Sequence, residues 1–155
     1  MLQPYPTGAA LIDQARKTVT FVWSRWFTAV RAAMNKRAEV VGSIALTAQT
    51  ASIASTTLPT SLLVHARYRV SFQVRVTTAA ATSSAIQVTI GWTDGGVAQT
   101  HVGTNLTGNL TTTRESAVIV IRCDSASAIT YTTTYASNPA AAMAYQLDAI
   151  VEHLP

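Results

Sequence analysis

Strict alternation of apolar and polar residues is the feature that most constrains this chain of 155 residues. Between residues 67 and 77 every second residue is apolar, and those between are polar or charged. The side chains of a β-strand point alternately to its two faces, whereas a helical face repeats every three to four residues. The segment is therefore predicted to be a strand with one face in a core and the other in water.

The same rhythm recurs to the end of the chain. The predicted strands are 40–46, 51–56, 67–77, 86–93, 97–102, 116–122, 129–135 and 143–152. The turn at 93–96 contains Asp-Gly and Gly-Gly, which tolerate the positive φ of a tight hairpin. Segment 116–122 is apolar on both faces, which predicts a central strand. Because no helical spacing separates the strands, the fold class is predicted to be mainly β, an antiparallel, jelly-roll-like β-sandwich of seven or eight strands.

The N-terminal part has a different period. Its apolar residues follow the i, i+3, i+4, i+7 spacing of one helical face, which predicts an amphipathic helix at about 18–37. The residues of this stripe are Val19, Val22, Trp23, Trp26, Phe27, Val30 and Met34. The two prolines and the glycine of the segment PYPTG at 4–8 favour an extended tail before the helix.

Charge divides the chain at the same place. The net charge is +4, and residues 1–39 hold six basic against two acidic residues, whereas residues 40–155 hold five of each. We therefore predict a basic attachment arm at 1–39 and a neutral β-sandwich body at 40–155. Charged residues make up 12% of the chain, about half the usual share of about 25%. A surface of hydroxyl groups in place of charges suits packing against neighbouring copies.

The residues with catalytic chemistry are few and scattered. His65, His101 and His153 have no second histidine or carboxylate at metal-ligand spacing, although His101 is expected to pair with Asp94 across a hairpin. The single cysteine, Cys123, follows an arginine that would lower its pKa, but it is expected to be a buried or half-buried structural thiol. Neither a nucleophile elbow nor a phosphate-binding loop is present. We therefore predict no enzyme activity and no catalytic, cofactor or metal site.

Membranes and nucleic acids are not expected as partners. No apolar stretch approaches the roughly 18 to 20 residues of a membrane span, and the first twelve residues lack the basic start and apolar core of a secretory signal. Trp23 and Trp26 share the apolar stripe of the arm and do not alternate with its cations as stacking platforms for bases would. A helix that lies on a membrane surface stays an alternative for the arm.

Several segments carry a family resemblance. They are RYRVS at 67–71, VTTAA at 76–80, VTIGWTD at 88–94, LTGN at 106–109 and above all ITYTTTYASNPA at 129–140. These resemble the β-sandwich body of tailed-phage virion proteins. PYPTG at 4–8, followed by WSRWF at 23–27, is similar to the attachment segment of phage fibre and connector-associated proteins. The resemblance covers most of the chain and implies a virion structural protein that is assembled in the cytoplasm of a bacterial host.

The expected function is attachment within a virion. The arm would dock on a connector, portal or capsid protein, through aromatic and aliphatic anchors and with cations that steer the approach. These docking residues are Trp23, Trp26, Phe27, Val30, Arg16, Lys17, Arg25 and Arg31. The body would self-associate, most plausibly as a trimer in a fibre or fibre base.

Two alternatives stay open. In the first, the chain is a decoration or cement protein whose sandwich binds the capsid lattice. In the second, the sandwich binds carbohydrate, with Trp92, Tyr131 and Tyr135 stacked on sugar rings. Because Trp92 alternates onto the same face as Val88 and Ile90, its position favours packing in the core.

Overall fold

The structure is a computed structural model, and it describes residues 11–13, 18–34, 37–60, 65–125, 127–138 and 142–155. The chain divides into two compact units, Met1–Arg37 and Ala38–Pro155. Each unit is described by itself below.

The first unit contains a small pair of strands followed in the sequence by one helix. Strands β1 (Ile12–Asp13) and β2 (Thr18–Val19) pair antiparallel, and helix α1 (Phe21–Met34) follows. The helix begins at Phe21 and not at residue 18, because 18–19 form a strand. The carbonyl oxygen of Thr20 accepts the first helical hydrogen bond from the amide of Ser24, at 2.9 Å, which makes Thr20 the N-cap residue. The extended tail that was predicted over 4–8 lies outside the described residues.

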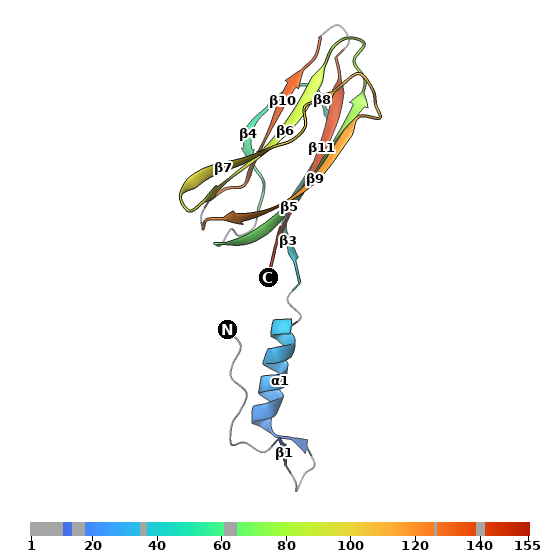
Figure 1. The fold of residues 1–155 in the computed structure, drawn as a ribbon. Helices are drawn as coiled ribbons and strands as arrows, with labels where there is room; N and C mark the ends of the chain where they lie inside the picture. Colours follow the sequence, from blue (N-terminus) through green and yellow to red (C-terminus); the bar gives the residue numbers. More distant parts are fainter. Residues whose placement is uncertain (1–10, 14–17, 35–36, 61–64, 126, 139–141) are drawn as a thin grey trace. The chain divides into compact units, whose positions relative to one another are not determined.

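The second unit is an antiparallel β-sandwich with the jelly-roll strand order (Figure 1). Strands β3, β11, β5 and β9 form the first sheet in that order, and β4, β10, β6 and β7 form the second, with β8 paired to β6. When the strands of this unit are renumbered from 1 to 8 in chain order, starting at β3 and leaving out β8, the two sheets have the orders 1-8-3-6 and 2-7-4-5. This is the arrangement of an eight-stranded jelly roll. The predicted fold class is confirmed. The strands are β3 (Glu39–Gln49), β4 (Ile53–Thr57), β5 (Ala66–Thr78), β6 (Ala85–Asp94), β7 (Val97–Val102), β8 (Leu106–Thr107), β9 (Arg114–Cys123), β10 (Thr130–Ala136) and β11 (Ala144–His153).

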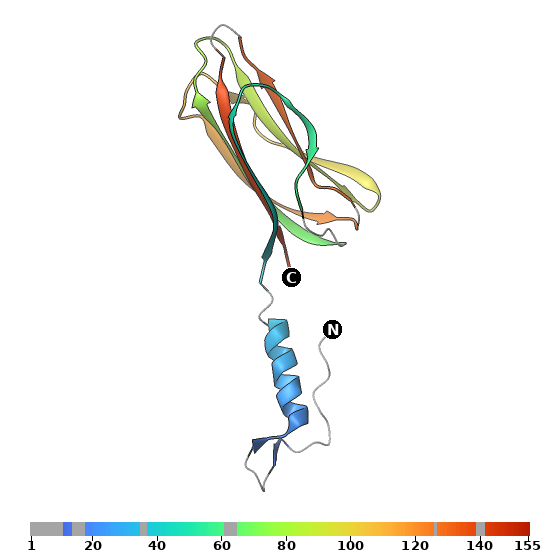
Figure 2. The same cartoon turned by 180° about the vertical axis from the view of Figure 1, so that it is seen from behind.

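The hydrophobic core lies between the two sheets, which face each other in both views of the ribbon (Figure 2). The inward residues are the ones that alternation predicted, because a strand with one wet face must turn every second side chain inward. Strand β5 contributes the longest series of buried residues, and β6 and β11 contribute the next longest. The buried residues of these three strands are Tyr68, Val70, Phe72, Val74, Val76, Ile86, Val88, Ile90, Tyr145, Leu147, Ala149 and Val151.

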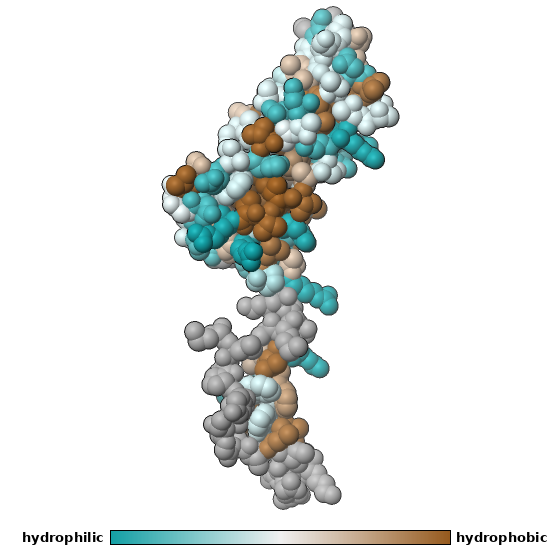
Figure 3. Space-filling model, in the orientation of Figure 1, coloured by the Kyte–Doolittle hydropathy of each residue, from teal (hydrophilic) through white to brown (hydrophobic). Residues whose placement is uncertain are grey.

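Strand β9 corrects the expectation of a central strand at 116–122. It lies at the edge of the first sheet and pairs with β5. Its inward residues pack on the core, but Val118 and Val120 point outward and are 63% and 58% exposed. Apolar residues on both faces of a strand therefore do not mean that both faces are covered within this chain. Apolar residues reach the surface of the body between hydrophilic ones (Figure 3).

Candidate docking surfaces

Helix α1 carries a cluster of three aromatic rings, Trp23, Trp26 and Phe27. The ring centroids lie 5.6 Å apart for Trp23 and Trp26, 5.9 Å for Trp23 and Phe27, and 5.2 Å for Trp26 and Phe27. Residues three and four apart lie on the same helical face, so the spacing predicted from the sequence produces the cluster. Both tryptophans are half-buried and Phe27 is 46% exposed. The helix thus presents a broad aromatic surface that is partly open to solvent.

The structure brings some of the predicted docking residues together. Val30 is half-buried and lies one turn beyond Trp26 and Phe27, on the face of the aromatic cluster. Arg25 and Arg31 are exposed on the helix, and Arg31 is the basic residue of its last turn, where it complements the helix dipole. Arg16 and Lys17 were also predicted as docking residues, but they lie outside the described residues.

The opposite face of α1 holds an aromatic residue that the sequence analysis missed. Phe21 is 74% exposed, and the guanidinium carbon of Arg25 lies 5.6 Å from the centroid of its ring. A cation over an aromatic face is attractive at this distance. The signal was present in the sequence, because residues 21 and 25 are one helical turn apart. Arg25, Thr28 and Ala32 line a shallow hollow together with Phe21.

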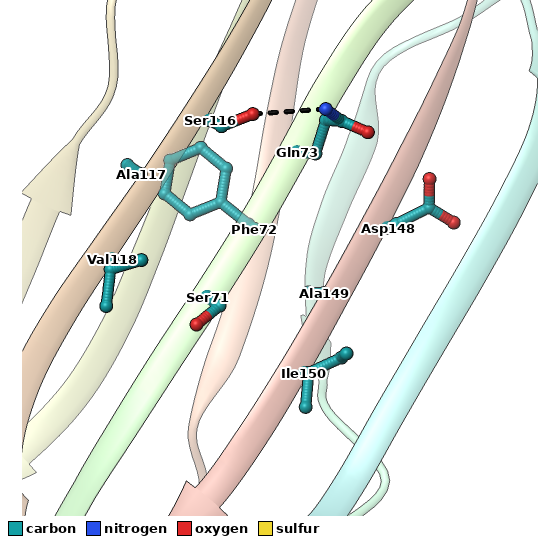
Figure 4. Close-up of a pocket in the computed structure, with 9 residues that line it drawn as sticks. All are labelled: Ser71, Phe72, Gln73, Ser116, Ala117, Val118, Asp148, Ala149 and Ile150. Carbon is teal, nitrogen blue, oxygen red and sulfur yellow. Dashed lines mark hydrogen bonds between the residues drawn. The ribbon is translucent and has the colours of Figure 1, made fainter.

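A second candidate surface is the outer face of the first sheet of the body. Val118 of β9, Ser71 of β5 and Ile150 of β11 are neighbours in one row across three strands (Figure 4). Because Ser71 is small and both neighbours are aliphatic, the sheet is hollowed at this point, with a volume of about 290 Å³. Beyond Ser71, Gln73 donates a hydrogen bond to Ser116 at 3.1 Å. This surface is apolar at its centre and was not predicted.

The groups with catalytic chemistry do not converge. His101 lies 6.2 Å from the Phe72 ring between centroids, so the expected pair with Asp94 is wrong: Asp94 binds Arg122 instead. Cys123 is buried, as predicted, and burial raises the pKa of its thiol, so the expectation that Arg122 lowers this pKa is also wrong. In the part of the chain that the structure describes, no three histidine, cysteine or acidic residues are placed to hold a metal ion.

The aromatic residues considered for sugar binding pack against the core of the body. Tyr131 is buried, and Trp92 is half-buried against the core. The hydroxyl of Tyr135 donates to the carbonyl oxygen of Met143 at 2.7 Å. A sugar-binding platform needs exposed ring faces beside each other. The three residues do not form one.

Asp124 links the ends of the two sheets. Its carboxylate oxygens accept the amides of Gly95 and Gly96 in the β6–β7 turn, at 3.0 and 2.7 Å, and one oxygen lies 3.3 Å from Nδ1 of His65. The amide of Asp124 donates to the Thr93 carbonyl oxygen. The hydrogen bonds from Gly96 and Gly95 are the main reason that the pKa of Asp124 is lowered, and the His65 ion pair adds to them.

This linkage predicts an acid-sensitive end of the sandwich. The pKa of Asp124 is lower in the folded protein than in the unfolded chain. The hydrogen bonds of its carboxylate therefore stabilise the folded protein fully above the ordinary carboxyl pKa of about 3.9, and this stabilisation is lost as the pH falls through the pKa of the folded state. We expect the urea midpoint to fall between about pH 5 and pH 2, and to fall less steeply in Asp124→Asn. Equal slopes for the two proteins would show that Asp124 does not carry this dependence.

The similarity of this chain to known proteins is weak. No protein-family model and no curated protein matches the sequence. One similar solved structure is that of the Bacillus endospore appendages, described as a novel family of disulfide-linked pili. It is 17% identical, with 78% of this chain and 94% of that chain covered and a TM-score of 0.35. A likeness this weak does not bear on fold or function. Among the described residues no helix is long and apolar enough to cross a membrane.

Proposed function

We propose that this chain is a non-enzymatic structural protein of a phage virion, a fibre or fibre-base protein held at the head–tail connector region by its N-terminal arm. The observation that carries the proposal is the aromatic cluster of Trp23, Trp26 and Phe27 on a 14-residue helix, in a unit separate from the jelly roll. Aromatic residues dominate the binding energy of protein interfaces, and contiguous exposed apolar patches mark interaction sites.

The arm supplies both parts of a docking element. The cluster would fill an apolar groove of a connector, portal or capsid protein. Arg25 and Arg31, which are exposed on the same helix, would steer the approach toward an acidic rim. The burial of three aromatic rings is sufficient for a specific anchor, because a few such residues carry most of the energy of an interface.

The body would associate with its own copies, with a trimer as the favoured state. The outer face of the second sheet suits this role because it carries uncharged hydroxyl and amide groups. The outward residues of β6 and β10 are Gln87, Thr89, Thr93, Thr130, Thr132 and Thr134. Jelly rolls occur in viral capsid and lectin domains.

The test removes the rings and keeps the full chain. In Trp23→Ala/Trp26→Ala/Phe27→Ala we expect incorporation into phage particles to fall by about tenfold or more, since the loss of even one hot-spot residue costs about 2 kcal/mol. The matched control is Val97→Ala/Leu110→Ala, which trims two exposed apolar residues of the body outside the row of outward residues of β6 and β10. It should incorporate normally. Normal incorporation of the aromatic variant, with its body still folded by circular dichroism, would refute the proposal.

The position in the particle separates the two structural functions. A density map with the chain confined to the connector vertex supports a fibre or fibre base. Density spread over the capsid lattice would instead support the decoration alternative, in which the sandwich itself binds the capsid. Binding of the full chain to a glycan array, at a level that survives removal of the three rings of the arm, would favour the carbohydrate-binding alternative.

A further inference from the structure

We infer that the outer face of the first sheet is a second docking surface, which binds a protein surface with an apolar centre and carboxylates at both ends. The inference rests on the body alone and does not depend on the arm or on the virion. The evidence is the placement of the body's arginines, the aliphatic residues between them, and the distribution of acidic residues in the same unit.

All five basic residues of the body gather on one face. The sequence from 38 to 155 holds five arginines and no lysine, and all five are on β5 and β9. They are the outward residues of these strands, since the residues that alternate with them on β5 are buried. The strands of the second sheet contain neither arginine nor lysine. The arginines are Arg67, Arg69, Arg75, Arg114 and Arg122.

The register places like charges directly opposite each other. Arg67 pairs with Arg122 at one end of the two strands, and Arg75 pairs with Arg114 at the other. Like charges at directly opposed positions of an antiparallel pair destabilise the sheet. Folding alone therefore does not explain two such pairs, whereas an anionic partner would relieve both.

Carboxylates of the body neutralise only part of this charge. Arg69 binds Glu152 at 2.6 Å and Arg122 binds Asp94 at 2.9 Å. Arg75 donates a hydrogen bond to the side chain of Gln146, at 2.9 Å, which leaves its charge in place. Arg67, Arg75 and Arg114 form no ion pair with any described residue. Guanidinium groups thus remain available to a partner at both ends of the face.

The centre of the face is apolar. Exposed Val118, Val120 and Ile150 lie between the two arginine pairs, and Val118 and Ile150 border the hollow at Ser71. Residues 67 and 75 are eight residues apart on one strand, which is about 26 Å at about 3.3 Å per residue. A partner that matches this face would carry aliphatic residues in the middle and carboxylates about 26 Å apart.

A second copy of this chain does not fit that description. Of the six acidic side chains in the described part of the body, Asp94, Asp124 and Glu152 are already in ion pairs, and Glu39 at the start of the edge strand β3 is exposed without one. Asp148 lies on the arginine face itself, and Glu115 accepts the amide of Thr104. A copy would therefore bring one exposed carboxylate without an ion pair, that of Glu39, and not a pair of carboxylates for the two ends. Nucleic acid would satisfy the arginines, but its phosphates and sugars leave the aliphatic centre unmatched.

Labelled peptides can test this surface with the full chain. The probe DDTVLVTDD has carboxylates at both ends, an aliphatic centre and an extended length of about 30 Å. We expect the full chain to bind it at least about tenfold more tightly than KKTVLVTKK or DDTSSSTDD, by fluorescence anisotropy. The double variant Arg75→Glu/Arg114→Glu should abolish the preference for the acidic over the lysine-ended peptide, because one end of the face becomes acidic while Arg67 and Arg122 keep the other end basic. The control Arg25→Glu/Arg31→Glu, with the same change in net charge, should not.

The outcomes separate the inference from its rivals. Equal affinity for the three peptides, or a control that loses the preference as the double variant does, would overturn it. Tighter binding of duplex DNA or phosphatidylserine vesicles, lost in the double variant, would assign the face to those ligands instead. The single variant Arg114→Glu guards against misfolding: it places opposite charges across β5 and β9, so it should weaken peptide binding without lowering the melting temperature. The aromatic variant of the arm should bind the peptide normally, so the two proposals fail separately.

Discussion

Leu147→Ala is expected to lower the free energy of unfolding by about 2–5 kcal/mol, the usual cost of removing a buried leucine side chain. Leu147 is 1% exposed and lies on β11, between Leu46 of β3 and Val74 of β5 in the register of the first sheet. The substitution removes side-chain atoms whose burial stabilises the folded protein. It also leaves a cavity that the neighbouring strands fill only in part. Urea unfolding at neutral pH measures the effect.

Val118 supplies the matched control for this substitution. It is an aliphatic residue of the same sheet, but its side chain points outward, so Val118→Ala should change the free energy of unfolding by no more than about 0.5 kcal/mol. Comparable losses in the two variants would mean that Val118 is buried in the folded protein. A small loss at Val118 would show that the exposed aliphatic residues of this face are not needed for folding, as a docking role requires.

Thr133→Val is expected to cost about 1–3 kcal/mol, because it leaves buried polar groups without a partner. Thr133 is 1% exposed, and its Oγ1 accepts the amide of Ile53 at 2.8 Å. The hydroxyl of Tyr145 donates to the carbonyl oxygen of Ala51 at 2.9 Å, so the 2.7 Å bond between Thr133 and Tyr145 is donated by Thr133. The chain of bonds fastens β4 to β10 at an irregularity of their register.

Two further variants separate packing from hydrogen bonding at this site. Valine has nearly the shape of threonine, so the loss in Thr133→Val reports the hydroxyl. Thr134→Val, at the neighbouring exposed position of β10, should be close to neutral. Tyr145→Phe should cost a similar amount to Thr133→Val, and the double variant should cost less than the sum, because the two hydroxyls act in one network. Additive losses would show that the two groups are independent.

The sequence predicted the strands of the body well because alternation is a local property. The eight segments that alternate or carry β-branched residues correspond to eight of the nine observed strands of the body, and the missed strand, β8, has two residues. A jelly-roll-like sandwich was inferred from the number and spacing of the strands, whereas the order of the strands in the two sheets came from the structure. The helix was expected to begin at residue 18, but Thr18 and Val19 pair with Ile12 and Asp13. This pairing joins residues that are separated in the sequence and overrides local helical spacing.

The two docking surfaces also differ in how far the sequence predicts them. The aromatic cluster followed from residues three and four apart on one helix, which any helix brings together. The arginine face could not be predicted in the same way. Alternation indicated which arginines point outward, but their opposition across β5 and β9 depends on which strands become neighbours and in what register. The prediction that 116–122 is a central strand was wrong for the same reason, because the position of a strand in a sheet depends on which strands become its neighbours.

The sequence by itself therefore determined which residues face the core, where the chain changes from helix to strand, and which helical face carries the rings. These properties depend on contacts within a few residues, through the fixed periods of the backbone. Only the tertiary structure decided that β9 is an edge strand, that Thr133 bonds to Tyr145, and that Arg75 opposes Arg114. Each of these depends on the pairing of distant strands, which is selected by the packing of the whole core and not by any one segment.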